Sequence, residues 1–327
     1  MQRVLDPLNP RRGRKKRTVV PEDTPFAHLL LQCIVKYSMC GEIHRYHREF
    51  MEDLKEILAR HGFNFKKQFG QNFISDTNLL RSIVTASGVD KSSTVVEIGC
   101  GAGTLTRVLS EYAKSVYAFE IDRALQPVLA ETLSGCENVE VTFKDFEKVN
   151  LPKLEQEIGE YTVVANLPYY ITTPLIMRFL EEGERVKSLV IMVQEEVAER
   201  LCAKENSPEY GAITAAIALR ASAKIIKRVP KTMFHPRPKV DSAVVKIDFE
   251  EDRLPVKDKK LYRDTVRCAF LNRRKTLENN LVNYFKIPRE TAQGILRKAG
   301  VPDKASGETL SPEALATLSD VIFEELK

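Results

Sequence analysis

Residues 96–103 read Val-Glu-Ile-Gly-Cys-Gly-Ala-Gly, and this stretch decides the fold class. Its first three residues end an apolar run that begins at Thr94, and its glycine turn leads into an amphipathic segment, Leu105–Tyr112. Glycines between a buried strand and a helix let the backbone pass close to a ligand. A lone glycine turn is as often only a tight turn, so its meaning depends on the rest of the chain.

The chain downstream alternates apolar runs with segments of helical periodicity. The runs expected to form buried parallel strands are Thr94–Ile98, Val116–Phe119, Val139–Phe143, Tyr161–Ala165 and Leu189–Val193. The helical segments are Leu105–Tyr112, Arg123–Leu133, Pro174–Leu180 and Gln194–Ala203. This alternation predicts an α/β fold, a Rossmann-like doubly wound sheet that binds ligands at the carboxyl ends of its strands. Two later strands, Ile225–Val229 and Ser242–Phe249, suit an antiparallel edge.

Beyond about residue 255 only helical periodicity remains. The expected helices are Leu261–Phe270, Lys275–Tyr284, Arg289–Lys298 and Pro312–Leu326. We therefore expect three parts: a basic, poorly structured extension over residues 1–50, a Rossmann-like domain over 51–252 and a small all-helical domain over 253–327. A helix at Met51–His61 would open the second part. The extension is either a basic arm or the product of an upstream start codon.

Composition and cysteine usage are those of an intracellular globular protein. Of the 327 residues, 43% are hydrophobic and 29% charged, and no apolar run approaches the roughly 20 residues that cross a bilayer. The six cysteines are scattered, which fits free thiols in a reducing cytosol, so we expect a cytoplasmic protein without a membrane partner. The group Cys33, Cys40, His44 and His47 matches no zinc spacing, and no metal is expected.

The charge is unevenly distributed. Residues 1–20 carry a net charge of +6, so the remainder of this chain of net charge +5 is close to −1. Residues 251–300 hold thirteen basic against six acidic side chains, whereas residues 301–327 hold two against six. One face of the C-terminal region is therefore a candidate phosphate-binding surface, with a solvated helix surface as the alternative.

Acidic residues at strand ends identify the ligand of the glycine turn. Thr104 stands where a dinucleotide fingerprint has its third glycine, and Glu97 places a negative charge beside the turn. Such a charge disfavours a pyrophosphate and suits a cationic amino-sulfonium compound, so S-adenosylmethionine is favoured over NAD. Glu120 ends the second strand and is expected to accept both ribose hydroxyls; the alternative, a helix-capping carboxylate, suits Asp122 better. Asp145 follows the third strand and is expected to accept the adenine amine, with an ordinary loop aspartate as the alternative.

A second loop suits an amino-bearing base. Residues 166–170 read Asn-Leu-Pro-Tyr-Tyr. If Asn166 Oδ1 and a carbonyl of the Leu167-Pro168 turn accept the two amine hydrogens of adenine, its nitrogen lone pair becomes available for attack on a methyl group. Tyr169 offers a stacking face worth roughly 1–3 kcal/mol. Phe234 is expected to cover the opposite face, unless it is an ordinary core aromatic.

The chain resembles the KsgA-type ribosomal RNA adenine N6,N6-dimethyltransferases. The resemblance rests on Lys67-Gln-Phe-Gly-Gln-Asn-Phe73, residues 97–103, residues 166–169, Phe234-x-Pro-x-Pro-Lys-Val-Asp-Ser-Ala-Val-Val245 and Ala269-Phe-x-Asn-Arg-Arg-Lys-Thr276, and it runs from about Phe63 to the C-terminus. It implies dimethylation of two adjacent adenines in a hairpin near the 3′ end of small-subunit rRNA, within a pre-ribosomal particle, by a protein that we expect to be monomeric. Cys100 stands where many relatives carry proline, a departure without consequence for the flanking glycines.

The resemblance also implies site residues. The cofactor contacts are Asn72, Ile74, Gly99, Gly101, Glu120, Asp145 and Asn166. The base site comprises Asn166, Leu167, Pro168, Tyr169 and Phe234. The RNA contacts are assigned to Lys66, Lys67, Arg237, Lys239, Arg273, Arg274 and Lys275.

Two other functions remain alternatives. One is a large-subunit rRNA adenine methylase of the resistance type, which the Asn272–Thr276 motif disfavours. The other is a non-catalytic assembly or transcription factor on the same fold, which the intact Asn166, Glu120 and Asp145 disfavour. A DNA adenine methylase is disfavoured because Leu167 interrupts the Asn-Pro-Pro-Tyr pattern.

Overall fold

The computed structural model describes residues 56–63, 73–74, 76–167, 171–251, 253–272, 275–302 and 304–326. The predicted basic extension lies outside these residues. The chain from Leu54 onward forms one compact unit. Of the predicted helix Met51–His61, the described residues 56–60 are helical.

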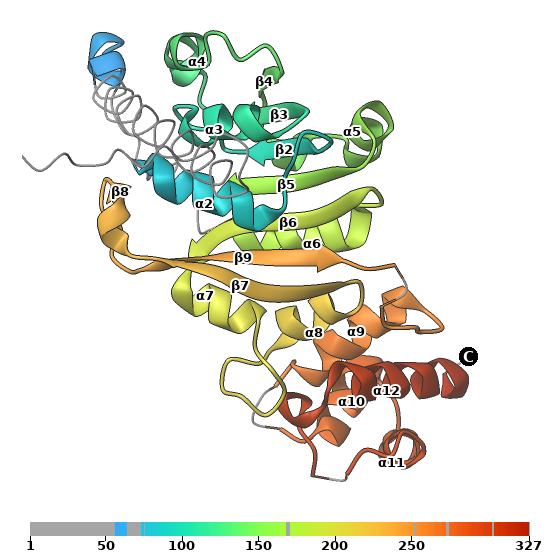
Figure 1. The fold of residues 1–327 in the computed structure, drawn as a ribbon. Helices are drawn as coiled ribbons and strands as arrows, with labels where there is room; N and C mark the ends of the chain where they lie inside the picture. Colours follow the sequence, from blue (N-terminus) through green and yellow to red (C-terminus); the bar gives the residue numbers. More distant parts are fainter. Residues whose placement is uncertain are drawn as a thin grey trace, which may run out of the picture. The chain divides into compact units, whose positions relative to one another are not determined.

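A seven-stranded mixed sheet organises this unit (Figure 1). Its strands are β2 (Thr94–Ile98), β3 (Ser115–Glu120), β4 (Val139–Phe143), β5 (Tyr161–Asn166), β6 (Val186–Gln194), β7 (Ala221–Val229) and β9 (Ser242–Phe249). Their order is β4-β3-β2-β5-β6-β9-β7, with β2 to β6 parallel and β9 antiparallel to both of its neighbours. The predicted strands, the doubly wound order and the antiparallel edge are confirmed.

Helices cover both faces of the sheet because its central strands are apolar on both sides. Val95 and Val164 belong to a hydrophobic cluster with α2 (Thr77–Ser87) and α3 (Thr104–Tyr112). Their neighbours Val96 and Val163 belong to a second cluster on the opposite face. The helices contributing to it are α5 (Leu151–Ile158), α6 (Thr172–Glu182), α7 (Glu195–Leu201) and α8 (Ala212–Ala218).

Three of these helices, α2, α5 and α8, were not predicted. Signals for α2 are present in the sequence, because Asp76 caps its first turn by accepting from Asn78 N at 2.8 Å and Leu79 N at 3.0 Å. Gly88 ends it in the left-handed conformation at φ +82°. The predicted helix Arg123–Leu133 is instead a 3₁₀ turn, η2 (Arg123–Leu125), followed by α4 (Gln126–Thr132).

The C-terminal helices share a separate hydrophobic cluster. They are α9 (Lys259–Ala269), α10 (Leu277–Phe285), α11 (Arg289–Lys298) and α12 (Pro312–Glu325), close to the predicted bounds. Residues before the expected boundary at 252/253 also join this cluster. Tyr262 donates its hydroxyl to Ala215 O at 2.9 Å, and Tyr210 donates to Leu310 O at 3.0 Å. None of the helices in the described residues has the length and apolar character needed to cross a membrane.

Candidate active site

The topology brings the predicted cofactor and base residues to one edge of the sheet. β2 lies between β3 and β5, and β4 follows β3, all in parallel. The carboxyl ends of these strands carry Gly99–Gly103, Glu120, Asp145 and Asn166. β2 is the strand from which the chain winds in both directions, which is where ligands bind in open α/β sheets.

The glycine turn requires glycine at three positions. Gly99, Gly101 and Gly103 have φ angles of +73°, +57° and +82°, which side chains rarely adopt. The turn is fixed to β3, since Gly99 N donates to Phe119 O at 2.8 Å. A Cβ at Gly103 would also lie 3.0 Å from atoms of Leu129 and Thr132 on the α4 side. Gly103 thus permits close packing against α4, and the approach of the turn to a ligand stays a prediction.

Glu120 connects β3 to the glycine turn. One carboxylate oxygen accepts from Gly101 N at 2.8 Å, and the other accepts from Ile121 N at 2.9 Å and Asp122 N at 2.8 Å. The side chain is 6% exposed, and burial raises its pKa while these three N–H groups oppose the rise. Asp122 caps η2 by accepting from Ala124 N at 3.1 Å, as its sequence position suggested. The ribose contact of Glu120 stays a prediction.

Glu97 differs from the expectation of a negative charge beside the turn. It is 1% exposed, and burial raises its pKa to about 8; the nearby Thr106 hydroxyl lowers the pKa and Glu120 raises it further. The carboxyl group is therefore largely protonated at neutral pH in the protein without ligand. Within the described residues, Glu97 Oε2 has no hydrogen-bond partner. A buried acid with an unpartnered oxygen fits a cationic amino-sulfonium ligand, which would favour its ionised form.

We expect Glu97→Gln to flatten the pH dependence of stability in the ligand-free protein. A carboxyl group with an ordinary pKa of 4.5 when unfolded and about 8 when folded gains a proton on folding. Its contribution is fully present below about pH 4.5 and is lost as the pH rises through about 8, for a change on the order of a few kcal/mol. Glutamine resembles the protonated acid and does not titrate. Urea unfolding between about pH 5 and 8.5 would contradict this reasoning if both proteins lost stability with the same slope.

Asp145 lies at the end of β4 with one oxygen engaged locally. Its Oδ1 accepts from Glu147 N at 3.0 Å, which starts the 3₁₀ turn η3 (Phe146–Lys148). Its Oδ2 lies 3.8 Å from Lys148 Nζ, and the side chain is 28% exposed. Asp145 therefore caps η3 with one oxygen, and acceptor capacity for an adenine amine remains on the same carboxylate. Its cofactor contact stays a prediction.

The base site is described in part. Asn166 is half-buried at the carboxyl end of β5, where it pairs with Met192 of β6, and Leu167 is buried. Pro168 and Tyr169 lie outside the described residues. Phe234 is 6% exposed and joins the same hydrophobic cluster as Ile74, with which it pairs between β1 (Phe73–Ile74) and β8 (Phe234–His235). Most of the Phe234 ring is thus covered by core, as in the alternative interpretation, and its stacking contact stays a prediction.

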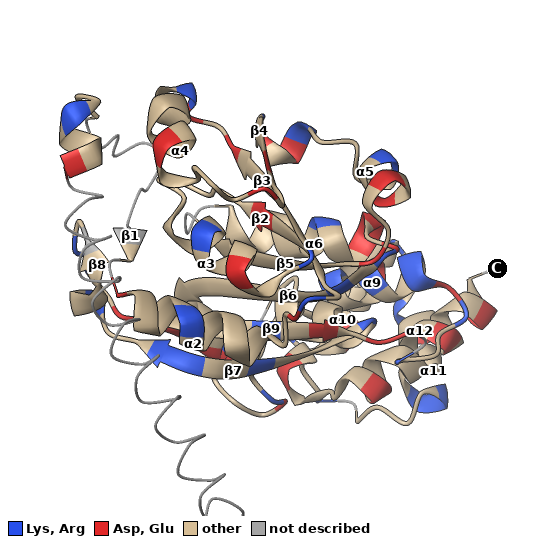
Figure 2. Cartoon of the chain, turned by 45° about the horizontal axis from the view of Figure 1, so that its top comes forward, with Lys and Arg blue, Asp and Glu red and all other residues tan. Residues whose placement is uncertain are grey.

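Of the predicted RNA contacts, Arg237, Lys239 and Lys275 are exposed. Lys66, Lys67, Arg273 and Arg274, together with the predicted cofactor residue Asn72, lie outside the described residues. Basic residues dominate α9 whereas α12 carries only acidic ones (Figure 2). Part of the basic charge is paired, because Lys257 contacts Glu324 and Lys298 lies 2.5 Å from Glu325. Fewer basic side chains are therefore available to bind phosphate on this face than the number of lysines and arginines in the sequence implies.

The fold, and the residues at the carboxyl ends of its parallel strands, indicate an α/β methyltransferase. Comparison with known proteins agrees with this class. The family model "Ribosomal RNA adenine dimethylase" matches residues 62–323. A protein of Bacillus licheniformis named "Ribosomal RNA small subunit methyltransferase A" is 45% identical over 280 residues, 83% of this chain and 96% of its own length. Its namesake in Clostridium botulinum is 44% identical over 273 residues, 83% of this chain and 99% of its own.

Solved structures give the same fold. A dimethyladenosine transferase from Plasmodium falciparum superposes with a TM-score of 0.67 at 24% identity, covering 77% of this chain and 98% of its own. The 23S rRNA methyltransferase ErmE superposes with a TM-score of 0.61 at 26% identity, covering 77% and 99%. The chain belongs to the ribosomal RNA adenine dimethylase family. S-adenosylmethionine is accordingly its cofactor, and the glycine turn, Glu97 and Glu120 fit that group.

Proposed function

We propose that this chain transfers methyl groups from S-adenosylmethionine to N6 of two adjacent adenines in a hairpin near the 3′ end of small-subunit rRNA, giving N6,N6-dimethyladenine. The observation that carries the proposal is the shared edge of the sheet, where Asn166 ends β5 and the glycine turn follows the neighbouring strand β2. Relatives named for small-subunit methylation are 43–45% identical to this chain over most of its length, which favours the small-subunit substrate.

The protein residues act by positioning and by fixed dipoles. The Asn166 side chain and a carbonyl of the Leu167-Pro168 turn accept the two hydrogens of the adenine amine, which draws the nitrogen away from conjugation with the ring. Tyr169, with Phe234 on the other side, holds the ring by stacking. S-adenosylmethionine supplies the electrophilic methyl group when bound. No strong base is needed, because the nitrogen becomes positively charged as it accepts the methyl group, and one of its protons is then acidic enough to leave to solvent.

The organisation around the site is proposed on the same basis. Residues 51–252 form the catalytic part and residues 253–327 the helical RNA-binding part, with 1–50 as an extension. Phosphate contacts are assigned to Lys66, Lys67, Arg237, Lys239, Arg273, Arg274 and Lys275. The same proposal has the enzyme act as a cytoplasmic monomer on a pre-ribosomal particle.

We expect purified protein to convert both adenines of immature small subunits to N6,N6-dimethyladenine, measured by transfer of labelled methyl groups and mapping of the modified bases. Immature small subunits without the added enzyme, and large-subunit rRNA with it, serve as controls. Modification of a large-subunit adenine would favour the resistance-type alternative. Particle binding with no methyl transfer would favour the assembly-factor alternative.

A further inference from the structure

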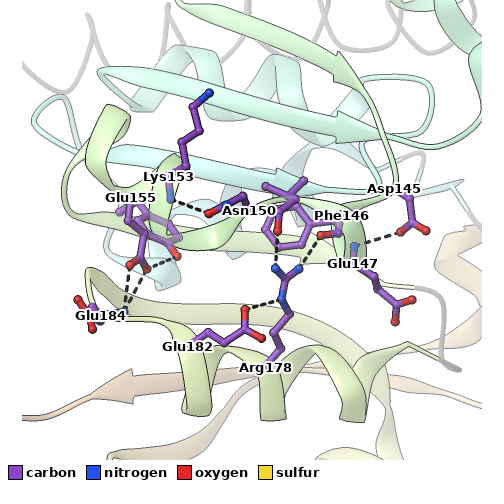
Figure 3. Close-up of polar contacts among 11 residues, drawn as sticks. Asp145, Phe146, Glu147, Asn150, Lys153, Glu155, Arg178, Glu182 and Glu184 are labelled. Atoms are coloured by element: carbon purple, nitrogen blue, oxygen red, sulfur yellow. Dashed lines mark hydrogen bonds and ion pairs between the residues drawn. The ribbon is translucent and has the colours of Figure 1, made fainter.

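Arg178 on α6 holds the turn that follows β4 (Figure 3). Its Nη1 donates to Phe146 O at 2.7 Å, its Nη2 donates to Val149 O, and its Nε donates to Glu182 at 3.0 Å. The side chain is 17% exposed. All three nitrogens of the guanidinium group are thus engaged, two of them with the backbone of one short segment.

That segment is the 3₁₀ turn η3 (Phe146–Lys148), which Asp145 caps. Two Arg178 hydrogen bonds bracket it, at its first residue and at Val149, the residue that ends it. The Phe146 ring lies 5.8 Å from the Arg178 guanidinium carbon and 5.0 Å from the Phe119 ring, in an edge-to-face arrangement. The turn is therefore fixed between β3 and α6.

The contact between the η3 turn and Arg178 of α6 joins two different parts of the proposed active site. Asp145 is the residue assigned to the cofactor adenine, and α6 begins at Thr172, directly after the loop that follows Asn166. A half-buried arginine that donates to two backbone carbonyls fixes their positions more strongly than a neutral donor does, because the guanidinium group is rigid and its hydrogen bonds are charge-assisted.

We propose that Arg178 is a positioning residue for the cofactor: it holds the Asp145 turn against α6 and thereby keeps the Asp145 carboxylate where the adenine amine binds. The inference rests on the proposed cofactor contact of Asp145. It makes cofactor affinity depend on a side chain that touches neither the cofactor nor the RNA base.

Arg220, the residue before β7, provides a matched control. It donates to Leu180 O at 3.0 Å and to Gly183 O at 2.8 Å, and its guanidinium carbon lies 5.8 Å from the Phe249 ring. Arg220 thus makes the same kinds of contact as Arg178, two backbone carbonyls and one aromatic face, but its two carbonyls belong to the C-terminal end of α6 and not to the turn after β4. Both arginines support the fold, and only Arg178 contacts the turn after β4.

The test compares S-adenosylmethionine binding by calorimetry in the full chain and in Arg178→Met, Arg178→Lys, Arg220→Met and Asp145→Ala. We expect Arg178→Met to weaken binding by about 10-fold or more, since small displacements of a positioned group have effects of this size. Arg178→Lys, which keeps one donor, should recover part of the loss. Arg220→Met should lower the melting temperature like Arg178→Met and leave affinity within about 2-fold, inside the scatter expected for independent sites.

A cofactor analogue with hypoxanthine in place of adenine lacks the exocyclic amine. It therefore tests whether the effects of the substitutions act through the proposed contact between Asp145 and that amine. Its affinity should change little on Arg178→Met or Asp145→Ala. Unchanged S-adenosylmethionine affinity in Asp145→Ala would remove the proposed cofactor contact itself. A loss in Asp145→Ala with none in folded Arg178→Met or Arg178→Lys, or an equal loss in Arg220→Met, would overturn the positioning by Arg178.

Discussion

Asn166→Ala is expected to slow methyl transfer by about 10²–10³-fold, the range seen when one preorganised hydrogen-bonding group is removed from an active site. Alanine removes the side-chain acceptor that reshapes the amine nitrogen. The backbone at Asn166 belongs to the β5–β6 pairing, opposite Met192, so the substitution should leave the strand in place. RNA affinity should stay near that of the unchanged protein, because the proposed phosphate contacts belong to other residues.

Single-turnover methylation of immature small subunits measures the chemical step apart from binding and release. Asn166→Asp is the informative companion, because aspartate keeps an acceptor of the same length. It should retain clearly more activity than Asn166→Ala. Equal loss in both variants, with RNA binding intact, would mean that the amide nitrogen and not the acceptor oxygen is required.

Much of the fold can be predicted from local patterns of apolar and polar residues in the sequence. The parallel strands are apolar on both faces, so their runs stand out, and Glu120, Asp145 and Asn166 are recognisable because each follows such a run. The antiparallel edge was predictable because the two late strands have no helix of adequate length between them. The Asp76 cap and Gly88 marked α2 as well, but neither was combined with the apolar spacing of the segment.

Other features depend on burial and on contacts between distant segments. Glu97 was assigned a negative charge, yet its environment in the folded chain raises its pKa to about 8. Arg178 gives no signal in the sequence, since a single arginine in an apolar helix usually points to solvent. Its partners, Phe146 and Val149, lie about thirty residues away and contribute only backbone carbonyls. Such contacts have no residue-type signature.

Glu120→Ala is expected to weaken S-adenosylmethionine binding by about 1–3 kcal/mol, the scale of leaving buried polar partners unsatisfied. The carboxylate performs two functions in this interpretation. It accepts from the N–H groups of Gly101, Ile121 and Asp122, and it is assigned to the ribose hydroxyls. Its removal therefore leaves donors of the glycine turn without their acceptor even before the cofactor binds.

Stability and affinity measured together separate these two functions. Glu120→Gln keeps the oxygen that can accept from Ile121 and Asp122 but turns an amide group toward Gly101 N–H or toward the ribose. It should therefore lie between Glu120→Ala and the unchanged protein in cofactor affinity. Calorimetry on folded variants, with urea unfolding of the same proteins without ligand, provides both quantities. If Glu120→Ala loses stability while its cofactor affinity stays unchanged, Glu120 supports the turn alone, and the ribose contact must be assigned to another residue at this edge of the sheet.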